Sequence, residues 1–181
     1  MRQPAGQRDL SRLPLKADGA LRVVVETPAG SHSKYDYDPE FDVFELGDTL
    51  PRGTEFPFDF GFFPSTLAED GDPLDALILS DRGLIVGIVL RTRPIGVIEM
   101  ETCEDGKMIR NDRLVVVPLS SVLFEKIETL SDLPAKLLDQ IETFFTVDSA
   151  FKGKQVRILA RSGPEKARKL IMAAQKTFAK R

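Results

Sequence analysis

Three aspartates lie within six residues of one another, in the run Asp70-Gly71-Asp72-Pro73-Leu74-Asp75. Gly71 allows the backbone to turn tightly and Pro73 stiffens it, so the three carboxylates could converge on one point. Such a convergence is repulsive unless a cation lies among the carboxylates. Hard oxygen ligands favour Mg²⁺ or Mn²⁺ over zinc. The spacing therefore predicts a divalent metal site.

Mg²⁺ commonly uses only one or two carboxylates and completes its shell with water and phosphate oxygens, which leaves one aspartate free to accept a proton. This set of groups fits phosphoryl chemistry, because a metal polarises water and screens a phosphate. Two other interpretations are open. The segment could be a solvated turn, since Asp and Gly favour turns. An EF-hand fits less well, because no glutamate closes the segment at the twelfth position.

The elements around this acidic run are mostly short strands. Apolar or alternating runs bounded by turn residues predict strands at 21–26, 34–37, 41–46, 76–80, 84–90, 94–100, 113–118 and 155–160. Helical spacing occurs only late in the chain, in one stripe from Leu137 to Phe145 and a second from Ala167 to Phe178. Many strands followed by two helices predict a mainly β (α+β) fold, a small barrel or curled sheet with helices outside it.

Composition limits the classes of function. The 181 residues carry a net charge of −3, so bulk charge attracts neither nucleic acid nor anionic lipid. Cys103 is the only cysteine and His32 the only histidine, which excludes an internal disulfide and a histidine-rich metal site. We find neither a signal peptide nor an apolar run of membrane-spanning length and expect a cytoplasmic protein. Residues 1–20 are expected to form an N-terminal arm, and residues 21–181 a single domain.

The run from Asp70 to Asp75 followed by Ala76-Leu77 resembles the signature of the family I soluble inorganic pyrophosphatases. Flanking segments resemble the same family in the same order, so the similarity extends from Leu21 to about Ala160: Val25–Pro28, Lys34–Tyr35, Phe56–Phe62, Arg93–Val97, Arg113–Pro118 and Phe144–Phe145. The resemblance implies a closed five-stranded OB-like barrel with two or three flanking helices. It also implies hydrolysis of inorganic pyrophosphate to two phosphates by metal-activated water, with Mg²⁺ as the cofactor, and a homo-oligomer.

Carried over by position, the resemblance assigns a role to six residues. Asp70 and Asp75 resemble metal ligands, and Asp72 resembles the proton acceptor. The substrate side resembles the family at three further positions, namely the acidic position Glu26, the phosphate-binding lysine Lys34, and Arg113 in place of a second lysine.

The sequence departs from the family on the cationic side of the expected site. A phosphate-binding arginine of the family falls on Asp48, and a fourth metal-binding aspartate falls on Asn111 after an insertion through 102–110. A tyrosine and a lysine fall on Asp148 and Ser149. Milder changes place Phe60 where many members have tyrosine and Asp36 where many have glutamate.

These departures leave the function with alternatives. New cations could replace the missing ones, and the candidates are Arg52, Lys107, Arg110 and Arg113. The chain could instead have lost efficient hydrolysis and serve as a metal- or phosphate-binding module. It could also hydrolyse a different phosphoanhydride. Nucleic-acid binding ranks last, because no basic stripe accompanies the phenylalanines.

Overall fold

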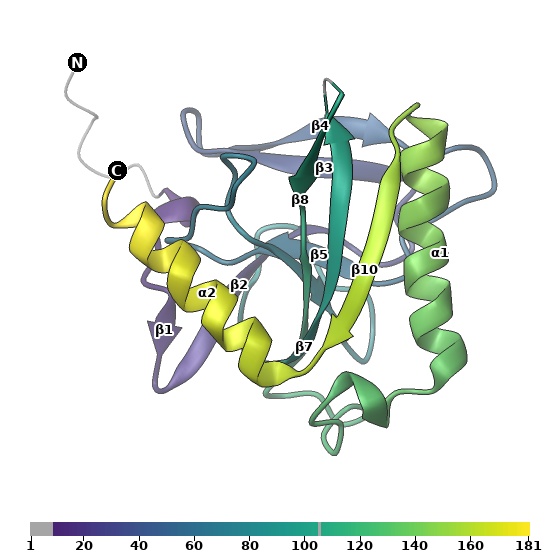
Figure 1. The fold of residues 1–181 in the computed structure, drawn as a ribbon. Helices are drawn as coiled ribbons and strands as arrows, with labels where there is room; N and C mark the ends of the chain where they lie inside the picture. The colour runs from purple at the N-terminus through teal and green to yellow at the C-terminus, as the bar shows by residue number, and fades with distance from the viewer. Residues whose placement is uncertain (1–8, 105) are drawn as a thin grey trace.

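A computed structural model describes residues 9–104 and 106–181 of the chain (Figure 1). The strands are β1 Lys16–Ala17, β2 Ala20–Thr27, β3 Ser33–Asp38, β4 Val43–Thr49, β5 Asp59–Phe62, β6 Asp75–Ile78, β7 Val89–Glu104, β8 Lys107–Arg110, β9 Arg113–Pro118 and β10 Val156–Ser162. The helices are η1 Leu10–Arg12, η2 Leu130–Asp132, α1 Ala135–Phe151 and α2 Pro164–Phe178, where η marks a 3₁₀ turn. No described helix is both long enough and apolar enough to cross a bilayer.

Five strands close into a barrel. Their order is β2, β5, β6, β9 and β7, and β7 pairs again with β2 to complete the ring. Only β6 and β9 pair in parallel among these neighbours. The predicted five-stranded OB-like barrel is therefore confirmed.

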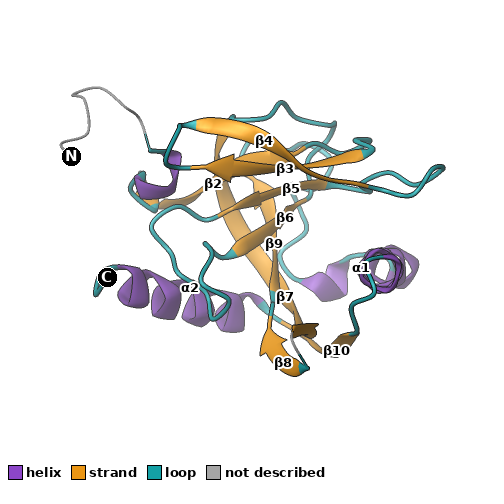
Figure 2. Cartoon of the chain, turned by 90° about the horizontal axis from the view of Figure 1, so that it is seen from above, coloured by secondary structure: helices purple, strands orange, loops and turns teal. Residues whose placement is uncertain are grey.

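The long strand β7 belongs both to the barrel and to an outer layer. Its first part pairs with β2 and β9, and its last part pairs with β8 and β10 (Figure 2). A register shift between Pro94 and Gly96 interrupts its pairing with β9. A Cβ at Gly96 would lie 2.5 Å from the Leu130 side chain and from the Ser162 carbonyl, so a larger residue would not fit there.

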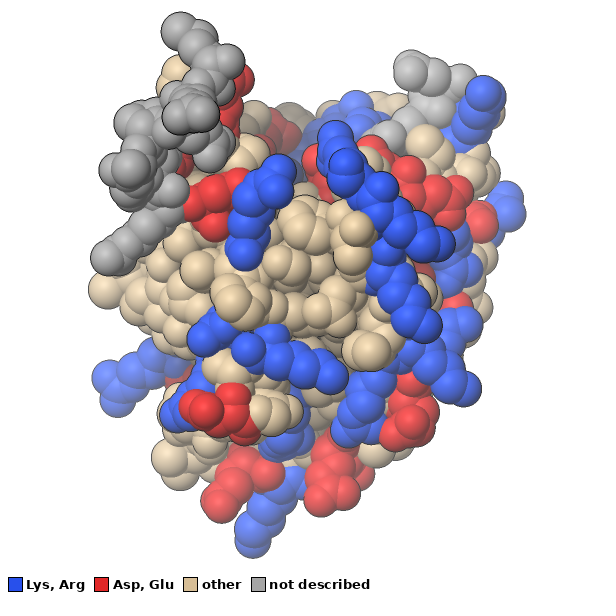
Figure 3. Space-filling model, turned by 90° about the vertical axis from the view of Figure 1, so that its left-hand side faces the viewer, with Lys and Arg blue, Asp and Glu red and all other residues tan. Residues whose placement is uncertain are grey.

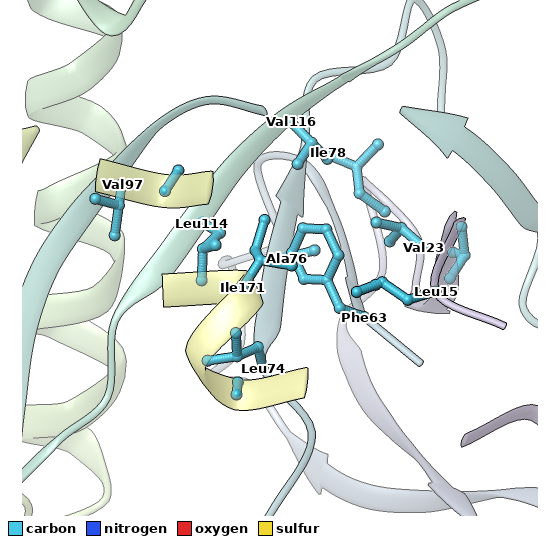
Figure 4. Close-up of a cluster of buried hydrophobic side chains, with 13 residues drawn as sticks. Leu15, Val23, Phe63, Leu74, Ala76, Ile78, Val97, Leu114, Val116 and Ile171 are labelled. Atoms are coloured by element: carbon cyan, nitrogen blue, oxygen red, sulfur yellow. The ribbon is translucent and has the colours of Figure 1, made fainter. Parts of the chain in front are cut away.

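Two apolar clusters fill the spaces on either side of the barrel wall. One of them includes Ala76 and Ile78 of β6 and packs against Ile171 of α2 (Figure 4). The other includes the alternate residues Leu77 and Leu79, and it packs against α1. Both faces of β6 are buried, which explains why its sequence is a continuous apolar run.

The structure differs from the predicted strands at three places. Residues 84–88 form a loop, because Gly87 has a φ of +84° and interrupts the extended run that was predicted there, so that prediction was wrong. Strands β5 and β8 were not predicted. Within the segment expected to be an arm, Leu15 is only 2% exposed and residues 16–17 form β1, whereas residues 1–8 lie outside the described part.

Candidate active site

The aspartate run forms the end of the loop that joins β5 to β6, and Asp75 is the first residue of β6. Thr66 fastens this loop, since its hydroxyl donates to the Phe63 carbonyl at 2.6 Å and accepts from the Leu74 amide at 3.0 Å. The Asp72 amide donates to the Asp70 carboxylate at 3.2 Å. With Gly71 at a φ of +97°, these bonds give the tight turn that the sequence predicted.

Asp70 and Asp75 line one groove of about 510 Å³, together with Asn111. Burial raises the pKa of Asp70, and the nearby carboxylates of Asp75 and Asp72 raise it further. In residues 9–104 and 106–181, no three acidic, histidine or cysteine side chains form a ready-made set of metal ligands. Two repelling carboxylates on one groove nevertheless fit Mg²⁺, which takes only one or two carboxylates and completes its shell with other oxygens.

Arg113 lies next to Asp75, one of the residues that line this groove. Its guanidinium contacts the carboxylate of Asp75 and the side-chain oxygen of Asn111, and it lies 5.4 Å from the centre of the Phe145 ring. Asp112 lines the same groove, but it pairs with Arg110 and accepts the Met100 amide at 3.0 Å. Of these two neighbours, Asn111 is therefore the one whose side chain contacts Arg113.

Glu26 and Lys34 lie together on the side of β2 and β3. The Glu26 carboxylate accepts the Tyr37 amide at 3.0 Å, and burial raises the pKa of Glu26 to about 8, with the Asp75 charge adding to this effect. Lys34 pairs with Asp36 at 2.6 Å. Burial lowers the pKa of Lys34, but Asp36, Asp75 and Glu26 outweigh that effect and raise it overall. Both residues therefore lie within electrostatic range of Asp75.

Gly47 provides the space for the Lys34–Asp36 pair. A Cβ at Gly47 would overlap the Asp36 carboxylate, so only glycine leaves that side chain where it is. Asp48, the next residue, is the cross-strand partner of Lys34 in the β3–β4 hairpin. Asp36 on β3 and Gly47 on β4 therefore both help to set the position of Lys34.

A further ion pair lies beside this hairpin, at the end of α1. Lys152 directly follows α1, and its Nζ lies 3.0 Å from the Asp48 carboxylate and 2.8 Å from that of Asp148. The hydrogen bond from Lys152 is the main cause of a lowered pKa of Asp48. The two positions at which the chain departs most from the resembled family are therefore joined by one ammonium group.

An aromatic cluster holds α1 against the barrel next to these charges. The rings of Phe144 and Phe145 lie 5.2 to 5.9 Å from those of Phe56 and Phe60, mostly tilted or edge to face. Such pairs stabilise a contact by about 0.5–1.5 kcal/mol beyond area burial. These phenylalanines form the wall behind the site.

The candidate replacement cations differ in position. Arg113 contacts Asp75, whereas Arg110 lines the groove but pairs with Glu99 at 2.8 Å and with Asp112 at 2.9 Å. Arg52 and Lys107 lie exposed, in a turn and on β8. Among the contacts given by residues 9–104 and 106–181, that between Arg113 and Asp75 joins one of these four cations to the aspartate run.

A family profile described as "Inorganic pyrophosphatase" matches residues 23–179. The chain belongs to the inorganic pyrophosphatase family. An inorganic pyrophosphatase of Synechocystis sp. is 36% identical over 152 residues, which cover 83% of this chain and 88% of the relative. One of Thermus thermophilus is 37% identical over 155 residues, covering 83% and 86% of the two chains.

Solved inorganic pyrophosphatases share the whole architecture. The crystal structure of the Thermus thermophilus protein superposes with a TM-score of 0.88 at 32% identity, covering 95% of this chain and 99% of that one. The structure from Neisseria gonorrhoeae gives 0.85 at 32% identity, with 94% and 99% covered. The family membership inferred from the aspartate run is thereby confirmed.

Sequence reasoning missed two charged residues that the fold places in important positions. Lys152 was not among the candidate cations, although its spacing of four residues from Asp148 at a helix end was a signal for an ion pair. Asp59 is fully buried and accepts the amides of Ala29 at 2.9 Å and Leu84 at 2.8 Å. Nothing in the sequence around Asp59 marks it as a buried anchor.

Proposed function

We propose that the chain hydrolyses inorganic pyrophosphate to two phosphates with the help of Mg²⁺. The observation that carries this proposal is the pairing of Asp70 and Asp75 on one groove with the cations Arg113 and Lys34 close by. A divalent metal held there would screen the substrate's charge and lower the pKa of water. Mn²⁺ and other divalent ions could serve in its place.

The chain's own groups have distinct parts in this reaction. Asp70 and Asp75 would hold the cation through their carboxylate oxygens. Asp72, on the same loop, would accept the proton that the attacking water loses as its oxygen bonds to phosphorus. The bridging P–O bond breaks at the same centre, and Lys34 and Arg113 would hold the phosphate oxygens on which negative charge develops. Glu26 would set the local charge next to Lys34.

The direct test is the release of phosphate from pyrophosphate by the purified protein with Mg²⁺. Asp72→Asn and Asp75→Asn should each lower turnover by about 100-fold or more, because each removes a proton acceptor or a metal ligand. Glu165→Gln, at the exposed start of α2, is the matched control and should keep full turnover. The absence of turnover with every divalent metal tried would refute the proposal.

We also propose that the protein works as a homo-oligomer in the cytoplasm. Several large apolar side chains of the described residues are more than 60% exposed, among them Phe41, Ile85 and Val122. Figure 3 shows a broad uncharged area bordered by charged side chains on one face. Where such exposed apolar side chains are contiguous, they often mark an interface between proteins. Light scattering would test this proposal, and a monomeric mass would refute it.

A further inference from the structure

Lys152 is a charged residue next to the candidate site that the proposed reaction does not yet use. Its ammonium bridges Asp148, one turn earlier on α1, and Asp48 on β4. Only 27% of the Lys152 side chain is exposed. A lysine whose ammonium pairs with carboxylates on two separate elements is held in place, unlike the usual solvated surface lysine.

The strand pairing places Asp48, one of the two carboxylates that hold this ammonium, next to Lys34. Asp48, which Lys152 contacts, is the cross-strand partner of Lys34. Lys34 in turn lies within electrostatic range of Asp75 and Glu26. Charges of alternating sign therefore lead from the end of α1 to a candidate metal ligand, in the order Lys152, Asp48, Lys34 and Asp75.

The helix that carries Lys152 is fixed relative to the site. Phe145 of α1 packs on Phe60 of β5 on one side and lies under the Arg113 guanidinium on the other. Phe145, seven residues before Lys152, thus joins α1 to the residue that contacts Asp75.

The ammonium group also has capacity for one more acceptor. An ammonium carries three N–H donors, and the two ion pairs of Lys152 engage two acceptors. Lysine is a compact cation that binds phosphate as a point charge. A phosphate oxygen next to Lys34 would fit the third donor.

We propose that Lys152 is a substrate-binding residue, whose ammonium binds a phosphate group of the substrate or product beside Lys34 while Asp48 and Asp148 hold it in position. This inference rests on the proposed function. The two carboxylates reduce the net attraction for an anion, but they fix a side chain that would otherwise lose rotamer entropy on binding. Lys152 thus supplies a cation from the end of α1.

The sharpest test compares two variants that differ only at Lys152. Asp48→Asn with Asp148→Asn removes the repelling charges, and the triple variant adds Lys152→Ala. If Lys152 contacts phosphate, the triple variant should show a KM for pyrophosphate and a Kd for inorganic phosphate about tenfold above those of the double variant. The turnover number should change less than threefold. Equal KM and Kd values in the two variants would overturn the inference, because Lys152 would then only neutralise the carboxylates.

Two controls separate binding from structure. Lys152→Arg keeps the charge and should keep the KM within about threefold. Arg161→Ala removes a cation that also pairs with α1, through Asp139 and Glu142, and should leave the KM unchanged. Thermal unfolding would show that each variant folds. A rise in KM for Arg161→Ala equal to the rise that Lys152→Ala adds in the triple variant would point to a structural effect and contradict the inference.

The inference and the proposed function can fail separately. If the unaltered protein hydrolyses pyrophosphate while the double and triple variants do not differ, only the role of Lys152 is refuted. If the unaltered protein releases no phosphate, the proposed function is refuted. Calorimetry with inorganic phosphate would then still support phosphate binding at Lys152, if binding is lost only in the triple variant.

Discussion

The guanidinium of Arg113 contacts the carboxylate of Asp75 at the start of β6. Only 16% of the Arg113 side chain is exposed, and Asn111 and the Phe145 ring hold it in place. A cation that is fixed in this position has two opposite effects. It attracts phosphate oxygens, and it opposes the entry of a second cation next to Asp75.

Arg113→Ala should therefore separate metal binding from turnover. Without the guanidinium, Mg²⁺ should bind more tightly in the absence of substrate, by about threefold, because one repelling charge is gone. Turnover of pyrophosphate should fall by at least about tenfold, because a phosphate-binding cation is lost. Calorimetry and phosphate release measure the two effects. Weaker Mg²⁺ binding together with unchanged turnover would contradict this account of Arg113.

Glu26 should give the metal-free protein a particular dependence of stability on pH. Its pKa is about 8 in the folded state against an ordinary value of 4.5, so the folded state binds more protons than the unfolded state between these values. Stability is therefore expected to fall as pH rises from about 4.5 to 8. Glu26→Gln should remove this part of the slope.

Thermal unfolding in a metal chelator measures this effect. At pH 8, Glu26→Gln should unfold roughly 3–6 °C above the unaltered protein, and at pH 4.5 the two should differ little. The same difference at both pH values would show that burial of the Glu26 charge is not the cause.

Gly47→Ala should weaken substrate binding without removing any charge. The new Cβ would overlap the Asp36 carboxylate and displace it from Lys34. We expect the KM for pyrophosphate to rise about three- to tenfold, because Lys34 loses the contact that positions it. Gly163→Ala is the control, because its Cβ would meet open space. An unchanged KM for Gly47→Ala would mean that Asp36 does not position Lys34.

Asp59→Ala should destabilise the fold. The carboxylate is fully buried and accepts the Ser80 hydroxyl and two backbone amides, and the two amides would lose this acceptor. The expected cost is about 2–4 kcal/mol. Asp59→Asn keeps one oxygen acceptor and should cost less. Denaturant unfolding would measure both, and a cost below 1 kcal/mol for the alanine variant would contradict the anchoring role.

Much of the fold could be predicted because the relevant signals are local. The strand predicted at 113–118 has the bounds of β9, since a buried apolar run needs no distant information. The prediction at 84–90 failed because Gly87 adopts a left-handed conformation that its apolar neighbours do not reveal. Strand β5 was missed because its phenylalanines could be assigned to the core, and that assignment does not require an extended backbone.

The candidate site was predictable where it lies within one loop. Asp70 and Asp75 line a common groove, whereas Asp72, the third aspartate predicted to converge with them, is not among the residues that line it. The ion pair between Lys152 and Asp48 joins residues about a hundred positions apart, and no local pattern could indicate it. Only the packing of α1 beside the β3–β4 hairpin brings these charges together.

The most direct test of the account is where a divalent cation binds. A crystal grown with Mn²⁺ in place of Mg²⁺ would reveal the ion by its anomalous scattering. We predict a peak within about 2–2.6 Å of carboxylate oxygens of both Asp70 and Asp75. The central claim would be contradicted if the electron density showed both side chains clearly and no anomalous peak lay beside them, or if the only peak lay elsewhere.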